Sequence, residues 1–259
     1  MPTAHLNGID LYYESHGNGP AILFAHGAGG NHLSWWQQIP YFSQQHHCII
    51  FDHRAFGRSF DSSGDGRTAF ARDALALLDH LEIERAFLVA QSMGGRTAAG
   101  MLLNAPGRIR ALVLAGTLGG AVSDETRELQ QAFAQTLPPG IRLIDRALGR
   151  RTEQQRPDLV FLYRAIARLN PPRPRDFLAP RPGYRGSVAQ RYAESGVPIL
   201  FLVGEDDRVV PPHIVEVAHR LVAGSRFRMI PEAGHSAYFE QPEHFNATVH
   251  AFFREAEQG

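Results

Sequence analysis

Ser92 stands at a junction that could turn its hydroxyl into a nucleophile. The apolar run Ala86–Gln91 predicts a buried strand that leads directly into Ser92, and the small residues that follow predict a helix. A serine hydroxyl attacks a carbonyl only when a base takes its proton, and a sharp strand-to-helix turn beside Gly94 would hold the hydroxyl clear of the backbone. An ordinary serine at a helix N-terminus is the alternative interpretation.

Two further segments carry the groups that such a serine needs. Glu205, Asp206 and Asp207 follow a predicted strand, and a carboxylate there could orient a histidine and stabilise its protonated ring. His235 follows the last predicted strand, and an imidazole takes and returns a proton near neutral pH. Taken singly, the acidic loop would be a solvated turn and His235 one of 13 histidines. Because the carboxyl ends of parallel strands share one edge of a sheet, the order Ser, Asp, His after successive strands favours a catalytic triad.

A glycine-rich segment, His26 to Gly30, follows another predicted strand. Its glycines allow the backbone to approach a ligand closely. The N–H groups of Ala28 and of Met93, the residue after the serine, are therefore candidate donors to the oxyanion of an acyl-transfer reaction. A phosphate-binding loop is the competing interpretation, and it fails because no lysine follows and the glycine spacing matches neither nucleotide motif.

The elements that must position these groups follow an α/β pattern. Short apolar runs alternate with helical patterns, which indicates parallel strands joined by crossover helices. Asn7-Gly8 predicts a tight hairpin before the first such unit, so the early strands should be antiparallel. Strands are expected at Ala21–Ala25, Cys48–Phe51, Ala86–Gln91, Ile109–Ala115, Val197–Val203 and Phe227–Ile230. Helices are expected at Arg67–Leu81, Thr97–Leu103 and Glu243–Phe253.

The alternation of strands and helices stops after residue 118. The next stretch shows helical patterns separated by proline-rich joints. We therefore expect one core formed by residues 1–118 and 194–259, with a helical lid inserted at residues 119–193.

The predicted lid is rich in arginine. From Arg142 to Arg191 there are 12 arginines and four acidic residues, a local charge of +8 in a chain of zero net charge. This charge could attract a carboxylate-bearing substrate. The alternative is that the arginines lie on solvated helix faces.

Composition excludes several kinds of chemistry and partner. All 26 basic residues are arginine, and without lysine no Schiff base, pyridoxal-phosphate lysine or phosphate-loop lysine is possible. Cys48 is the single cysteine, so an intrachain disulfide and a cysteine-based metal site are excluded. Equal numbers of acidic and basic residues argue against nucleic acid as a partner. We expect a small-molecule substrate and no metal or organic cofactor.

The sequence predicts no membrane association. No apolar run reaches the ~18–20 residues that span a bilayer. The first residues, Met1 to His5, have neither the basic nor the apolar region of a secretory signal. We therefore expect a cytoplasmic protein that is a monomer or a homodimer.

Together these segments resemble the α/β-hydrolase superfamily. Within it they resemble the branch of small serine esterases, lactonases, carbon–carbon hydrolases and cofactor-free peroxidases, and the resemblance to enol-lactone hydrolases is the greatest. The resemblance implies a mostly parallel sheet with antiparallel first strands, helices on both faces and a helical lid. The family spacing selects Asp207 as the acid, with Asp206 as the fallback. The segments that carry it are His26–Gly30, Asp52–Ser59, Ala90–Gly95, Gly204–Asp207, Gly234-His235, Glu240, Pro242 and Phe245.

The sequence departs from the family pattern at two positions. Ala90 replaces the first glycine of G-x-S-x-G, and Ala55 replaces a glycine in the loop after Asp52. Ser92 also argues against two branches of the superfamily. Haloalkane dehalogenases and epoxide hydrolases carry an aspartate at that position.

The resemblance implies two-step acyl transfer on a carboxylic ester or an enol-lactone. Ser92 would be the nucleophile, His235 the base and Asp207 the acid, with Ala28 and Met93 as the oxyanion hole. A carbon–carbon hydrolase or lyase of this fold, or a receptor that retains the triad, is the alternative. Trp35 and Trp36 either line the pocket or pack in the core. The expected pocket residues are Gly29, Trp35, Trp36, Gln91, Val209 and Tyr238.

Overall fold

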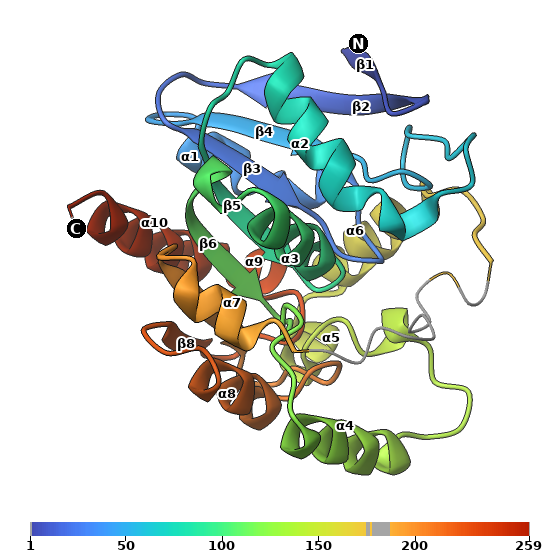
Figure 1. Ribbon diagram of the computed structural model, residues 1–259. Helices are drawn as coiled ribbons and strands as arrows, with labels where there is room; N and C mark the ends of the chain where they lie inside the picture. The colour runs from blue at the N-terminus through green and yellow to red at the C-terminus, as the bar shows by residue number, and fades with distance from the viewer. Residues whose placement is uncertain (1, 175–176, 178–186, 259) are drawn as a thin grey trace.

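An eight-stranded sheet forms the centre of the molecule (Figure 1). A computed structural model describes residues 2–174, 177 and 187–258. The strand order is β1-β2-β4-β3-β5-β6-β7-β8; β1 and β2 are antiparallel to their neighbours, and the pairs from β4 to β8 are parallel. This arrangement confirms the expected fold class. The strands are β1 (Thr3–Leu6), β2 (Ile9–His16), β3 (Ala21–Ala25), β4 (His47–Phe51), β5 (Ala86–Gln91), β6 (Ile109–Ala115), β7 (Ile199–Gly204) and β8 (Arg226–Ile230).

The sequence explains why the sheet begins with a hairpin and continues with buried strands. Asn7 and Gly8 connect β1 to β2 with positive φ angles of 50° and 78°, the backbone that a type I′ turn requires. Every residue of β3, β5 and β7 is buried. Strands covered on both faces have no polar side, which is why these three appear in the sequence as unbroken apolar runs.

Two helical layers cover the sheet (Figure 1). Side chains of α2, α3, α7 and α8 join one hydrophobic cluster, and those of α1, α6, α9 and α10 join a second cluster on the opposite face. Among the described helices, none is both long enough and apolar enough to cross a membrane. The α-helices are α1 (Ile39–Phe42), α2 (Phe70–His80), α3 (Gly94–Asn104), α4 (Asp124–Thr136), α5 (Arg150–Gln155), α6 (Pro157–Arg168), α7 (Ala189–Glu194), α8 (Pro212–Arg220), α9 (Ala237–Glu240) and α10 (Pro242–Gln258).

Helix α3 begins three residues before the helix predicted from the sequence at Thr97. Gly94 and Gly95 have low helix propensity, which hid this first turn. A side chain at Gly94 would collide with the carbonyl of Ala25 in β3, so the helix packs on the sheet there only because the residue is glycine.

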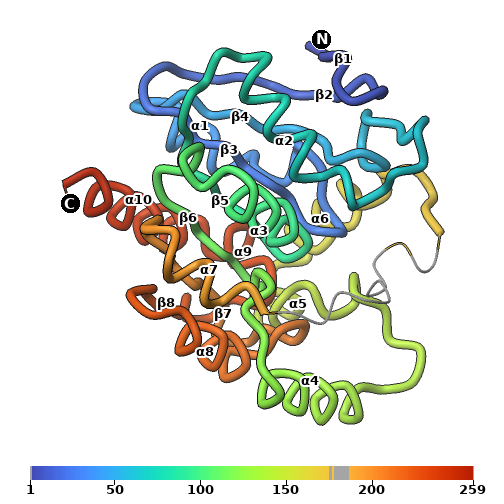
Figure 2. The backbone as a smooth tube through the Cα atoms, in the orientation of Figure 1, coloured from blue at the N-terminus to red at the C-terminus, as the bar shows by residue number. Residues whose placement is uncertain are grey.

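The segment between β6 and β7 contributes to the layers on both sheet faces. Figure 2 shows the chain leaving β6, running out through α4 and returning through α5 and α6. Tyr163 of α6 packs in the second cluster, whereas Tyr192 of α7 packs in the first and donates a hydrogen bond to Gly119 O at 2.6 Å. Helix α7 therefore packs with the core helices. The division into a core and a lid at residues 119–193 stays a prediction.

Candidate active site

Ser92 lies at the sharp turn between β5 and α3. Its φ angle of 50° is in the left-handed region that side chains rarely adopt. The backbone N–H of Ser92 donates to Ala115 O at 2.8 Å, which extends the pairing of β5 and β6 to the turn. Strain of this kind persists only when the surrounding structure holds it, and here it directs the side chain away from the strand.

The hydroxyl of Ser92 faces His235, which follows β8. His235 Nε2 lies 2.9 Å from Ser92 Oγ, and Nδ1 lies 2.9 Å from Asp207 Oδ2. His235 and Asp207 are both buried. The carboxylate can only accept, so it holds the proton on Nδ1 and leaves Nε2 free to take the proton of the serine.

Asp207, and not its neighbour Asp206, contacts the histidine. Asp207 Oδ1 also accepts the N–H groups of Val209 and Val210, each at 2.8 Å. Asp206 turns the other way and accepts the N–H and a guanidinium N–H of Arg150, both at 2.7 Å. The structure thus brings together Ser92, Asp207 and His235 and leaves Asp206 outside the group.

Gln91 and Gly116 both lie against His235. Gln91 Nε2 donates to the carbonyl of His235 at 3.1 Å, so this predicted pocket residue also holds the backbone of His235. A Cβ at Gly116 would lie 3.0 Å from His235 Nδ1, and the φ angle there is 58°. Both the close approach and the backbone angle therefore require glycine at position 116.

The loop after β3 passes beside the same turn, where a Cβ on Gly27 would lie 3.2 Å from Ser92 Cβ. Gly27 O accepts the N–H of Gly30 at 3.0 Å and His26 Nδ1–H at 2.8 Å. In a trans peptide the next N–H points the opposite way, so the amide of Ala28 faces away from these donors. Within the described residues, neither this amide nor that of Met93 has a hydrogen-bond partner, and both residues belong to one small apolar cluster. Backbone amides without an internal partner are the kind of donor that an oxyanion requires, so Ala28 and Met93 stay predicted oxyanion-hole residues.

Burial lowers the pKa of His26 to about 4. Histidine in the unfolded chain takes up a proton below about pH 6.5, whereas folded His26 does so only near pH 4. We therefore expect His26 to account for about 3 kcal/mol of the fall in the free energy of unfolding between pH 7 and pH 4. Urea unfolding at several pH values measures this. His26→Asn keeps a donor for Gly27 O and should flatten the slope, whereas the exposed-site control His5→Asn should not. If the free energy of unfolding of His26→Asn falls with pH as steeply as that of the wild type, His26 is not the source of this pH dependence.

Glu240 and Tyr163 complete the support of the site, and the sequence motifs alone did not predict their contacts. The Glu240 carboxylate accepts the N–H of Gly149 at 2.7 Å and of Gly234 at 2.9 Å, which fixes the residue before His235; burial raises the pKa of Glu240. The Tyr163 hydroxyl accepts a hydrogen bond from Ser236 at 3.0 Å, and burial raises its pKa to about 12. The only signal for Tyr163 was its place on an apolar helix face.

Three of the predicted pocket residues pack in the core or lie at the surface. Trp35 is fully buried, with its ring 5.1 Å from Phe24 and 4.7 Å from Tyr238, so these two predicted pocket residues pack in the core. Trp36 is 44% exposed at the surface, edge-on to the Phe239 ring. A flat indole supplies a large apolar area that packs equally well in a core or a pocket, which is why the sequence could not separate the two.

Gly29 and Val209 remain close to the proposed reaction centre. A Cβ at Gly29 would lie 3.5 Å from the Tyr163 hydroxyl. Val209 is half-buried, two residues after Asp207, and its N–H holds the Asp207 carboxylate. Their contact with substrate stays a prediction.

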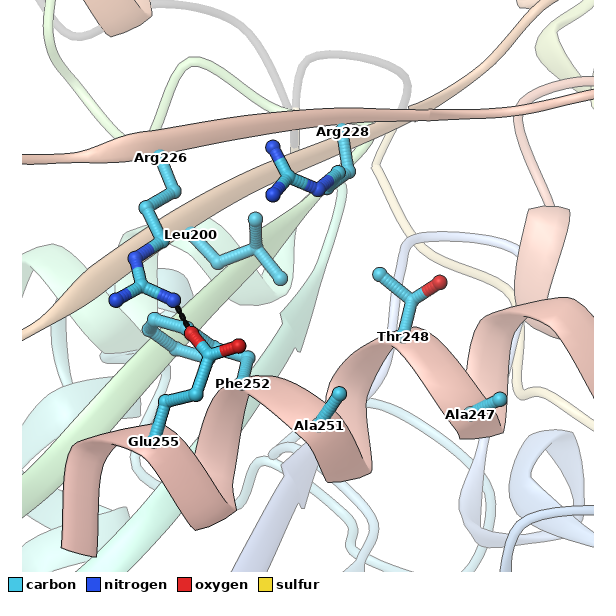
Figure 3. Close-up of a pocket in the computed structure, with 8 residues that line it drawn as sticks. All are labelled: Leu200, Arg226, Arg228, Ala247, Thr248, Ala251, Phe252 and Glu255. Carbon is cyan, nitrogen blue, oxygen red and sulfur yellow. Dashed lines mark ion pairs between the residues drawn. The ribbon is translucent and has the colours of Figure 1, made fainter. Parts of the chain in front are cut away.

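A surface cavity of about 340 Å³ lies away from this group (Figure 3). It opens between the start of β8 and α10, where Arg226 pairs with Glu255 and Arg228 lies nearby. Ser92, Asp207 and His235 follow the carboxyl ends of their strands, so the cavity is at the opposite end of the sheet and is no part of the candidate active site.

The chain belongs to the family described as alpha/beta hydrolase fold, which matches residues 20–242. A Mycobacterium tuberculosis protein named "Putative non-heme bromoperoxidase BpoC" is 30% identical over 95% of this chain and 98% of its own. A thermophilic esterase from Thermogutta terrifontis has 28% identity and a TM-score of 0.81, covering 98% of this chain and 97% of its own. Est816, described as an N-acyl homoserine lactone degrading enzyme, has 27% identity and a TM-score of 0.78 over 97% and 100%.

Proposed function

We propose that the protein is a serine hydrolase that cleaves a small carboxylic ester or lactone. The observation that carries the proposal is the distance of 2.9 Å between Ser92 Oγ and His235 Nε2, with Asp207 on the other ring nitrogen. The similarity of the whole chain to an esterase and to a lactone-degrading enzyme supports this class of reaction.

In the first step Ser92 attacks the carbonyl carbon of the substrate. His235 takes the hydroxyl proton as the new C–O bond forms, and Asp207 stabilises the resulting imidazolium. The carbonyl oxygen becomes an oxyanion within reach of the Ala28 and Met93 amides. Loss of one such donor costs ~3–4 kcal/mol in barrier height. The C–O bond to the leaving alcohol then breaks as His235 returns its proton to that oxygen.

The second step releases the acyl group from Ser92. His235 removes a proton from water, and the hydroxide oxygen attacks the acyl carbonyl. The same two amides hold the new oxyanion. When the bond to Ser92 Oγ breaks, His235 returns the proton to the serine, and the carboxylic acid leaves. A lactone follows the same path, except that its leaving alcohol stays joined to the acyl group through the carbon chain, so the second step releases a single hydroxy acid.

The arginines of residues 142–156 bear on whether the site favours a charged substrate. Four of them form ion pairs with carboxylates: Arg142 with Asp145, Arg150 with Asp206, Arg151 with Glu232 and Arg156 with Asp158. Paired side chains contribute little net attraction to a ligand. We therefore expect KM values for matched neutral and anionic esters to agree within about fivefold, measured side by side in steady-state assays. A KM more than tenfold lower for the anionic ester would support a carboxylate-binding lid instead.

A substrate panel tests the proposed class. Purified protein should turn over a neutral short-chain aryl ester or an acyl homoserine lactone faster than a vinylogous β-diketone. Faster cleavage of the β-diketone would support the carbon–carbon hydrolase alternative. Saturable binding of an ester without turnover would support the receptor alternative.

A further inference from the structure

The end of α6 and the segment after it hold the loop that carries Ala28. Asn31 donates a hydrogen bond from Nδ2 to Ile166 O at 3.0 Å. Asn170 donates from Nδ2 to Gly29 O at 3.4 Å and accepts the N–H of Gly57 at 2.9 Å. These contacts join two loops that follow neighbouring strands, β3 and β4, to one helix end.

Arg173 makes the most direct of these contacts. Its Nη2 donates to Ala28 O at 3.3 Å, and its Nη1 donates to Ala55 O at 3.2 Å. The guanidinium carbon lies 3.9 Å from the centre of the Phe56 ring, over its face. A planar guanidinium can satisfy this geometry because its N–H groups diverge in one plane while its face stacks on an aromatic ring.

Arg173 differs from the paired arginines of residues 142–156. Burial lowers its pKa, and among the described residues no carboxylate pairs with it. Its hydrogen bonds go instead to backbone carbonyls: Ala28 O after β3, Ala55 O after β4 and Pro171 O. Arg173 is half-buried, and its contacts within the described part of the chain are these carbonyls and the Phe56 ring, which indicates that the side chain serves to hold the loops.

The contact with Ala28 acts on the proposed oxyanion donor. The carbonyl before the Ala28 amide is held by Gly30 and His26, and the carbonyl after its Cα is held by Arg173. Both peptide planes that flank Ala28 are therefore fixed. Because the peptide bond is planar, fixing the Gly27 carbonyl also fixes the direction of the Ala28 N–H, and the second contact prevents the residue from rotating about its Cα.

We propose that Arg173 is a positioning residue that holds the Ala28 amide in the oxyanion hole by bridging Ala28 O and Ala55 O. The proposal rests on the proposed acyl-transfer function. Arg173 acts through the loop, so its loss should weaken binding of the transition state more than binding of the ground state.

Three variants test this proposal with a neutral short-chain ester. Arg173→Met should lower kcat roughly 10- to 100-fold and change KM less than about threefold, because a displaced donor no longer meets the oxyanion. Arg173→Lys retains the charge but lacks the flat, divergent donors, so we expect a fall in kcat of at least about fivefold. Arg168→Met, an exposed arginine on the last turn of α6, is the matched control and should retain the wild-type kcat.

Two outcomes would overturn the proposal. A wild-type kcat in Arg173→Lys would mean that charge alone suffices. A raised KM for anionic esters with unchanged kcat in Arg173→Met would make the residue a substrate contact. Thermal unfolding shows whether Arg173→Met is folded; if it is not, Arg173→Lys decides. Asn170→Ala, which removes the hydrogen bond to Gly29 O, should lower kcat in the same direction.

The same assay separates this inference from the proposed function. If wild-type protein turns over the ester and Ser92→Ala does not, the proposed function stands whatever Arg173 does. If wild-type protein has no activity on the panel, both fall together.

Discussion

Ser92→Ala is expected to lower kcat for the best ester of the panel by roughly 10⁴- to 10⁶-fold while leaving substrate binding nearly unchanged. The variant removes the atom that forms the acyl-enzyme bond but leaves His235, Asp207 and the two free amides in place. Residual turnover would come from water activated by His235 beside the proposed oxyanion hole. Steady-state kinetics measure kcat, and calorimetry with a slow substrate measures binding.

A matched control guards this result against a general effect of losing a serine. Ser62→Ala changes an exposed serine that donates to Gly8 O, in the turn between β1 and β2. It should retain wild-type kcat and KM. Turnover by Ser92→Ala within about tenfold of the wild-type value would show that another residue is the nucleophile.

Asp207→Asn is expected to lower kcat by about 10⁴-fold, because an amide can offer its N–H to His235 and stabilise the wrong tautomer. Asp206→Asn is a closely matched control, one residue earlier in the same loop. It loses an ion pair with Arg150, which is 69% exposed, and kcat should change less than about threefold. Parallel pH–rate profiles of the two variants measure the difference.

The relative losses of kcat in the two variants show which aspartate orients His235. A large loss in Asp206→Asn together with a small loss in Asp207→Asn would require the loop after β7 to rearrange and would contradict the observed contact between Asp207 and His235. Equal small losses would show that neither carboxylate orients the histidine.

The sequence predicted the sheet and the positions of the three candidate catalytic residues because both depend on local patterns. The central strands β3, β5 and β7 are buried, largely apolar runs of five or six residues, and Ser92 and Asp207 follow two of them. His235 follows β8, an edge strand of five residues that includes Arg226 and Arg228. In a parallel sheet, that local position decides which edge a residue occupies. The family spacing was needed only to choose Asp207 over Asp206.

Contacts that join distant segments could not be predicted in the same way. Arg173 lies 145 residues from Ala28 in the chain, and nothing in a proline- and arginine-rich stretch marks one guanidinium as the one that contacts the loop after β3. Tertiary packing, and not residue type, decided where Trp35 and Gly94 lie. For Trp35 the alternatives were the core and the pocket, and for Gly94 they were a loop and the first turn of α3.

Ala55 illustrates a departure whose cost is visible only in three dimensions. The residue adopts a φ of 67°, a conformation that costs roughly 1–2 kcal/mol for a residue with a Cβ. The sequence showed that a glycine of the family pattern was missing there. It did not show that the backbone retains the left-handed angle, with the Ala55 carbonyl held by Arg173.

Covalent labelling with a fluorophosphonate tests the central claim most directly. Intact-mass analysis should show one added phosphonyl group on wild-type protein, and peptide mapping should place it on Ser92. Ser92→Ala should take up no label, and Ser62→Ala should react as the wild type does. A label on any other residue, or a wild-type protein that stays unmodified while folded, would contradict the account.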